Sequence, residues 1–262
     1  MKTYSIGKVS KLMGLSIEGI RNYEKSGIIS PRREEGSEYR KYSYLDITSL
    51  LRAKMYRSLG FSLKDTCRLT NESEMDEIRR EIHQRKQELL GEKELLTAKI
   101  RFLESLGRDV EELEGGLGVA GLRLCPSFYR MEFAHNGEID FSEETVTLFQ
   151  EWISYVPFVH ISTRYHGADV YGGLAVDEDY ARLFSIQEKP GKVEYHPSTL
   201  CVFTTVMEEE NGFSKADCIN SIREYAAYHR FELAPDYIAH TVMGTSKKRG
   251  YKRYRQIFGK IV

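Results

Sequence analysis

The sequence predicts an α+β protein of two domains joined by a long helix. Three observations lead to this prediction: two short helices near the start of the chain, a seven-residue apolar repeat that begins at Met75, and alternating strand-like and helical runs after residue 118. We therefore expect a small N-terminal domain at 1–72, a coiled-coil helix at 73–107, a linker at 108–118 and an α+β domain at 119–262.

The stretch from Tyr4 to Lys25 is typical of two helices joined by a tight turn. Ile6, Val9 and Leu12 are apolar at spacings of three, and Ser16 is suited to cap the start of a second helix. Helix, glycine-containing turn and capped helix form the helix-turn-helix pattern, in which the second helix enters a major groove of DNA. An ordinary helical hairpin within a core is the alternative for this stretch taken alone.

Basic side chains are concentrated in the first 70 residues, which carry 14 Lys and Arg against 7 Asp and Glu and hence a charge of +7. The rest of the chain carries 24 against 32, a charge of −8. Within the basic part, the run from Arg32 to Tyr42 places two basic clusters on either side of a turn-like tip at 34–37, which predicts a β-hairpin, or wing. Its Arg and Lys side chains can neutralise phosphates, so the charge asymmetry favours a nucleic-acid-binding module.

A short helix is expected at 44–59, another from Ser62 to about Leu69, and then one long helix from Ser73 to Leu106. In the long helix, positions 75, 82, 89, 96 and 103 are all apolar. The partner positions 78, 85, 92, 99 and 106 are Ile, Arg, Glu, Lys and Leu, so the second seam is apolar only at its ends. The repeat favours a homodimer through residues 75–106 over a surface helix packed on its own domain.

The segments SIGKVSKLMGLSIEGIRNYEKSGIISP and EYRKYSYLDITSLLRAKMYRSLGFSLKD resemble, motif by motif, the DNA-binding domain of MerR-family transcription regulators. Asn22 replaces one of the family's usual paired tyrosines, and Glu38 replaces the usual glycine of the wing. The resemblance implies a winged helix-turn-helix, an antiparallel dimer contact, double-stranded promoter DNA and RNA polymerase as partners. It also implies DNA contacts by Lys8, Ser16, Arg21, Tyr23, Tyr39, Arg40, Tyr42 and Lys64.

The pattern of the C-terminal part predicts the order strand, helix, strand, strand, and this order occurs twice. The first occurrence places its helix at 143–155 and the second places its helix at 215–228. We therefore expect two similar β-α-β-β halves. This order resembles the gyrase-inhibitor-like effector domains of multidrug-responsive regulators of the BmrR type, which implies a small-molecule effector.

Residues 119–262 are rich in aromatic side chains, which can line a pocket for a flat ligand or can simply form the core. The resemblance and the positions of the rings suggest these ligand contacts: Phe158, Tyr171, Phe203, Tyr225 and Tyr254. The BmrR type has a buried glutamate for a cation where this chain has Ala239. Glu132 and Glu194 are the substitutes, whereas His160, His166 and His240 suit a neutral or anionic ligand.

Several classes of protein are disfavoured. We expect no membrane span, because no run of about 18 apolar residues occurs, and no signal peptide at Met1. Cys67, Cys125, Cys201 and Cys218 are scattered without metal-ligand spacing, so we expect reduced thiols in a cytoplasmic protein with no metal, cofactor or catalytic residue.

The resemblance as a whole implies a DNA-binding regulator, expected to activate transcription. It would distort the promoter spacer when an aromatic or hydrophobic molecule binds the C-terminal domain. Two alternatives remain open: a metal- or redox-sensing regulator, and an effector domain with hydrolase activity that uses Trp152 and Glu132.

Overall fold

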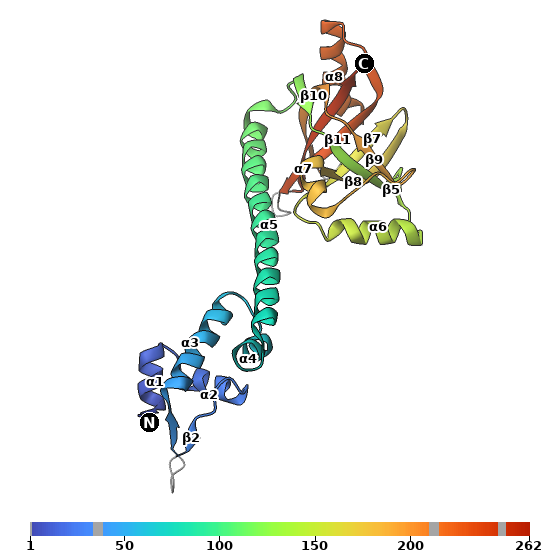
Figure 1. The fold of residues 1–262 in the computed structure, drawn as a ribbon. Coiled ribbons are helices and arrows are strands. Elements are labelled where there is room, and N and C mark those ends of the chain that lie inside the picture. The colour runs from blue at the N-terminus through green and yellow to red at the C-terminus, as the bar shows by residue number, and fades with distance from the viewer. Residues whose placement is uncertain (1, 34–38, 210–214, 246–249) are drawn as a thin grey trace. The chain divides into compact units, whose positions relative to one another are not determined.

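The computed structural model describes residues 2–33, 39–209, 215–245 and 250–262. It divides into two compact units, Met1–Lys93 and Glu94–Val262, which are described separately (Figure 1). The tip of the predicted wing at 34–38 lies outside the described residues.

The N-terminal unit begins with the two predicted helices, α1 (Ile6–Met13) and α2 (Ile17–Lys25). Gly14 adopts a left-handed conformation, with φ of 63°, and ends α1. The Ser16 hydroxyl caps α2 by accepting a hydrogen bond from the backbone N–H of Gly19 at 2.9 Å. The helix-turn-helix prediction is therefore confirmed in its local geometry.

The wing strands form a small antiparallel sheet in the order β1 (Tyr4–Ser5), β3 (Arg40–Tyr42), β2 (Arg32–Arg33). Helices α3 (Tyr44–Ser58) and α4 (Leu63–Asn71) follow. Their start signals are serine caps at Ser43 and Ser62. The core of this module consists of the buried side chains of Val9, Ile20, Ile28, Ile29, Tyr42, Leu50 and Ala53.

Helix α5 (Met75–Gly116) is longer than the sequence predicts, because it runs through most of the segment expected to be a linker. A glycine inside a helix costs about 1 kcal/mol relative to alanine, so Gly107 alone does not end it. Leu113 is buried, and Glu112 forms an ion pair with Arg123 at 2.7 Å. These tertiary contacts hold the last turns in helical form until Gly115 and Gly116.

The C-terminal unit contains a curved antiparallel sheet in the order β4-β10-β12-β11-β7-β8-β5-β6, with β9 paired to β5. The strands are β4 (Gly121–Cys125), β5 (Phe128–His135), β6 (Glu138–Ile139), β7 (Val159–His166), β8 (Asp169–Asp177), β9 (Val193–His196), β10 (Thr199–Glu209), β11 (Leu233–Thr245) and β12 (Lys252–Ile261). The helical segments are α6 (Glu143–Ile153), α7 (Glu178–Ala181), the short 3-10 helix η1 (Arg182–Phe184) and α8 (Lys215–His229). The α+β prediction is confirmed.

Helices α6 and α8 pack on the same face of this sheet, because the strand registers place the core residues under both helices on one side. Met131 and Leu174 lie under α6, whereas Val202 and Ile257 lie under α8. Successive side chains of a strand point to opposite faces of a sheet. The strand residues that alternate with the helix-covered ones therefore form the other face. We call it the open face, and its central members are Arg123, Phe128, Arg130, His160, Ser162, Asp177, Phe203, His240, Gln256 and Phe258.

Candidate functional site

Helix α2 presents basic side chains to solvent, as the second helix of a helix-turn-helix must in order to reach base edges. The Arg21 side chain is 50% exposed, and its Nη1 lies 3.9 Å from a Glu18 carboxylate oxygen. Glu18 also lies 3.5 Å from Lys25 Nζ. Exposed ion pairs of this kind contribute little and break easily, so Arg21 can exchange Glu18 for a nucleic-acid acceptor.

Arg40 joins the wing to α2. Its Nε lies 2.7 and 2.8 Å from the two carboxylate oxygens of Glu24, and both side chains are partly buried. Charge-assisted contacts of this geometry are stronger than exposed pairs and fix orientation. Arg40 therefore holds the wing strand β3 against the second helix in this structure.

The structure corrects the expectation for Tyr42, which was predicted to contact DNA. Its side chain is 0% exposed and belongs to the core of the N-terminal module. Burial raises the pKa of its hydroxyl, which has no hydrogen-bond partner among the described residues. Tyr23 is half-buried against the same core, whereas the other predicted contacts Lys8, Ser16, Tyr39 and Lys64 are exposed.

In the C-terminal unit, a cavity of about 220 Å³ lies between helix α5 and the open face. Helix α5 contributes Phe102, Ser105, Leu106 and Asp109 to its wall. The rest of the wall consists of Arg123, Pro126, His160, Asp177, Tyr180, His240, Thr241, Val242, Gln256 and Phe258. Residues separated by more than 150 positions in sequence thus line one partly open space, which we call the α5 cavity.

Two histidines in the α5 cavity bond to each other. His160 Nε2 and His240 Nδ1 are 3.0 Å apart, so one of the two nitrogens carries the proton that they share. Burial lowers the pKa of both rings, and the positive charge of Arg130 lowers the pKa of His240 further. Both rings are therefore neutral near pH 7. The second nitrogen of His240, Nε2, is buried without a partner among the described residues.

Two carboxyl groups share the cavity. Burial raises the pKa of Asp177, and it also raises the pKa of Asp109 on α5. Asp109 Oδ1 accepts a hydrogen bond from Gln256 Nε2 at 3.0 Å, which ties α5 to strand β12.

Aromatic contacts also join α5 to this unit. The ring of Phe102 lies edge-on to Phe158, with centroids 5.9 Å apart, and to Tyr180 at 6.1 Å. Phe158 and Tyr180 stack at 4.7 Å. A molecule in the cavity would contact Phe102 and Tyr180 directly, so its binding would affect how α5 packs against the rest of the C-terminal unit.

The five predicted ligand residues do not gather in this cavity. Phe158 is buried behind Phe102 and Tyr180. Phe203 packs beneath Arg123, with 3.9 Å between the guanidinium carbon and the ring centroid. Tyr254 is half-buried on β12.

Tyr225 lies on α8, where it packs on the helical side of the sheet, and its ring centroid lies 4.3 Å from that of His229. Of the predicted histidines, His160 and His240 meet in the α5 cavity, whereas His166 pairs with Asp236. The prediction missed Phe102 and Asp109, because α5 was placed outside the ligand-binding domain.

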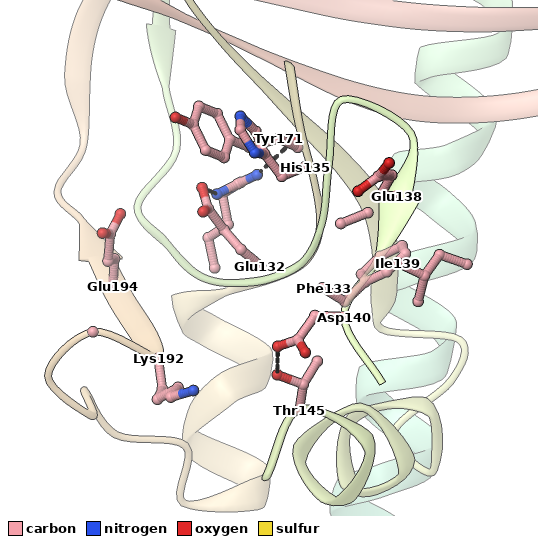
Figure 2. A pocket seen from close by; sticks show the side chains of 13 residues that line it. Glu132, Phe133, His135, Glu138, Ile139, Asp140, Thr145, Tyr171, Lys192 and Glu194 are labelled. Carbon is pink, nitrogen blue, oxygen red and sulfur yellow. Dashed lines mark hydrogen bonds and ion pairs between the residues drawn. The ribbon is translucent and has the colours of Figure 1, made fainter. Parts of the chain in front are cut away.

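Tyr171 lines a second, more charged pocket of about 450 Å³ (Figure 2). Here Arg130 is 1% exposed, and its Nη1 donates to Glu132 Oε1 at 2.5 Å. The same carboxylate oxygen lies 2.7 Å from Arg164 Nη2. Glu132 is thus occupied by two arginines, and Glu194, the other predicted partner for a cation, lies 3.6 Å from His196.

Among the residues that the structure describes, no group of three or more His, Cys, Asp and Glu side chains is placed to hold a metal ion. Within the same residues, no helix is long and apolar enough to cross a lipid bilayer.

Comparison with known proteins identifies the N-terminal module. Residues 4–72 match the model of the MerR HTH family regulatory proteins. The HTH-type transcriptional regulator HmrR of Rhizobium leguminosarum bv. viciae is 35% identical over 111 residues, which are 42% of this chain and 82% of that protein. The HTH-type transcriptional activator TipA of Streptomyces coelicolor is 28% identical over 124 residues, 47% of this chain and 46% of TipA. The chain thus spans about half the length of TipA.

Among solved structures, the chain resembles that of EcmrR bound to DNA in an open promoter complex. The likeness covers 99% of this chain and 100% of that one, with 17% identity and a TM-score of 0.37.

Proposed function

Since the chain belongs to the MerR family of DNA-binding transcription regulators, we propose that it binds promoter DNA and changes transcription when a small molecule occupies the α5 cavity. The observation that carries this proposal is the cavity wall itself, because Phe102 and Asp109 of α5 form part of it. Helix α5 begins directly after the DNA-binding module, at Met75. A ligand that alters the packing of α5 therefore acts on the helix that connects directly to the DNA-binding module.

The proposed DNA contacts are those predicted from the sequence, with two changes. Tyr42 is left out because it is buried, and Arg40 is assigned to orient the wing as well as to approach phosphate. Arg21 is assigned to base edges from α2, where a charged side chain in the groove discriminates among bases. The remaining members of the set are Lys8, Ser16, Tyr23, Tyr39 and Lys64.

We propose that two copies associate through α5. The apolar residues of the seven-residue repeat, which include Ile82, Leu89 and Leu96, are exposed on this helix. In the N-terminal unit, an apolar groove of about 340 Å³ is lined by Leu59, Phe61 and residues of α5. Exposed apolar side chains at heptad spacing favour burial against a second helix.

In the proposed mechanism, the dimer binds both halves of a promoter spacer and RNA polymerase occupies the same promoter. Ligand binding repositions the two DNA-binding modules, and the spacer is bent and undertwisted so that the promoter elements align. Deforming a site of this size costs a few kcal/mol, which phosphate contacts by two basic modules are able to offset. The protein acts as an activator in this scheme.

We also propose that the C-terminal unit consists of two similar halves. Strand β5, helix α6 and strands β7 and β8 follow the same order as β10, α8, β11 and β12, and the central pair of the sheet is β7 with β11. Superposition of the two halves tests this proposal, since corresponding strands should overlay about an axis between β7 and β11. Strands that overlay only after reordering would contradict it.

Selection from a random library of duplex DNA tests the DNA-binding proposal. The full chain should enrich an inverted repeat, and the Arg21→Ala variant should enrich no sequence while remaining dimeric. Enrichment of a site with no inverted repeat, or equal enrichment by the Arg21→Ala variant, would contradict the assigned geometry.

A further inference from the structure

We propose that Asn22 is a specificity-determining residue, which recognises one adenine in each half of the DNA site through its side-chain amide. Asn22 lies on helix α2, one position after Arg21, and is not among the DNA contacts predicted from the sequence. The inference rests on the proposed function in one respect, namely that α2 enters the major groove of DNA. It adds the identity of a base that this helix reads.

Asn22 points away from the core of the N-terminal module. Because an α-helix has 3.6 residues per turn, Asn22 lies about 160° around α2 from Ile20. Ile20 is 0% exposed and belongs to the core of this module, whereas Asn22 is exposed. The second helix of a helix-turn-helix turns its exposed face to the base edges. Asn22 therefore lies on the part of α2 that would face the floor of the groove.

The charged side chains around Asn22 are paired with one another. Residues three and four positions apart are neighbours on the surface of a helix, which places Glu18 and Lys25 beside Asn22. Glu18 lies 3.5 Å from Lys25 Nζ and 3.9 Å from Arg21 Nη1. Within the described part of the chain, no residue forms a hydrogen bond with the side-chain amide of Asn22. This amide can therefore bond to a base without the loss of an existing contact.

The chemistry of the amide selects adenine. An asparagine side chain carries an NH₂ donor beside a carbonyl acceptor. In the major groove adenine presents an acceptor, N7, beside a donor, N6–H₂, so that two hydrogen bonds form at once. Guanine presents two acceptors, cytosine one donor and thymine one acceptor, so each of these bases pairs with only one group of the amide. Adenine is therefore the base that satisfies both groups of Asn22.

A glycine on the same side of α2 favours a close approach to the bases. The asparagine side chain is short, so it reaches a base edge only if the helix backbone lies near the floor of the groove. Gly19, nearly one turn before Asn22, has no side chain that would hold the helix away. A Cβ at this position would lie 3.1 Å from Ser16 Oγ, so glycine also leaves room for the serine cap.

Fluorescence anisotropy of the full chain with a duplex that carries the selected inverted repeat tests the proposal. Each adenine of a half-site is replaced in turn, together with its symmetry mate, by 7-deaza-2′-deoxyadenosine, which keeps the base pair but lacks the N7 acceptor. We expect one position at which this replacement weakens binding about tenfold, since a bidentate contact provides discrimination of that order. In Asn22→Ala, the replacement at this position should have no effect.

Lys25→Ala is the control on the same face of α2. A lysine that contacts phosphate contributes to all sequences alike, so its loss weakens binding without changing the preferred base. This variant should therefore keep the full sensitivity to the loss of N7.

The series of modified duplexes needs only the unchanged chain, so the proposal stays testable even where Asn22→Ala does not fold. Specific binding that tolerates 7-deaza-2′-deoxyadenosine at every position would overturn it, and so would a sensitivity that persists in Asn22→Ala. Failure of the proposed function is a different result, because the full chain would then enrich no duplex in the selection, and this inference would fail with it.

Discussion

The Nε of Arg85, on helix α5, donates a hydrogen bond to the backbone carbonyl of Leu59 at 2.8 Å, at the end of helix α3. The next residue, Gly60, has φ of +92°, and a Cβ there would lie 2.4 Å from Arg85 Nη2. Arg85 also pairs with Glu88 and Glu92. This contact explains why a charged residue occupies position 85 of the apolar repeat: it fastens the DNA-binding module to α5.

Replacing Arg85 by alanine should therefore weaken the coupling between the two elements. Hydrogen bonds to charged groups contribute about 1.5–3 kcal/mol, so we expect the N-terminal unit to lose about 1–2 kcal/mol of unfolding free energy. Chemical denaturation followed by circular dichroism measures this loss. Arg79→Ala is the matched control, because Arg79 is 77% exposed and pairs only with Asp76 in the described contacts, so its loss should stay within about 0.5 kcal/mol. Equal losses of unfolding free energy in the two variants would show that the hydrogen bond from Arg85 to Leu59 does not stabilise the N-terminal unit.

Arg21→Ala should weaken specific DNA binding by about 10- to 100-fold, since a good side-chain contact to a base edge contributes about 1–3 kcal/mol. Fluorescence anisotropy with a selected DNA duplex measures the affinity, and light scattering establishes whether the variant keeps the oligomeric state of the parent chain. Arg79→Ala again serves as the arginine control. Unchanged affinity in Arg21→Ala would remove Arg21 from the recognition surface.

Tyr42→Phe distinguishes the buried tyrosine from a DNA contact. The hydroxyl is buried without a partner among the described residues, so its removal should leave stability unchanged or raise it by about 1 kcal/mol. DNA affinity should stay the same. A marked loss of affinity at unchanged stability would show instead that Tyr42 turns outward to meet phosphate.

Two adjacent carboxyls should make opposite contributions to the dependence of stability on pH. Hydrogen bonds from Arg182, Ser127 and Tyr195 lower the pKa of Glu178 to about 2, whereas burial raises the pKa of Asp177. A lowered pKa stabilises the fold above the ordinary value near 4.5, and this contribution disappears as pH falls towards 2. A raised pKa stabilises the fold at low pH, and that contribution disappears as pH rises through the folded-state pKa.

Thermal melts between pH 2 and pH 8 test this pair. Glu178→Gln should flatten the acid-side loss of stability, and Asp177→Asn should raise the melting temperature at pH 7 relative to the parent chain. A lower melting temperature for Asp177→Asn at pH 7 would mean that its charge is needed in the fold.

The sequence was most informative where structure depends on neighbouring residues. The caps at Ser16 and Ser62, and the turn at Gly14, are local signals, and the N-terminal module could be predicted from them. The burial of Tyr42 could not be predicted in this way, because whether a strand residue faces the core depends on the packing of the whole module.

The α5 cavity was not predictable in the same way. His160 and His240 lie 80 positions apart and meet only because β7 pairs with β11 in a register that puts both rings on the open face. Asp109 enters the wall only because α5 continues past its predicted end, whereas Phe102 lies within the predicted helix and was missed because that helix was assigned to the dimer contact. That extension of α5 depends on tertiary contacts, and these cannot be inferred from the helix propensities of the residues.

The central claim is that a small molecule in the α5 cavity changes transcription through the DNA-binding module. Single-round transcription in vitro tests it, with purified RNA polymerase, a promoter that carries the selected DNA site, and a ligand found by thermal-shift screening of the full chain. We predict that the ligand raises the transcript yield with the parent chain, and that the Arg21→Ala variant gives no increase. A ligand that stabilises the chain and occupies the cavity, yet leaves transcript yield unchanged, would contradict the claim.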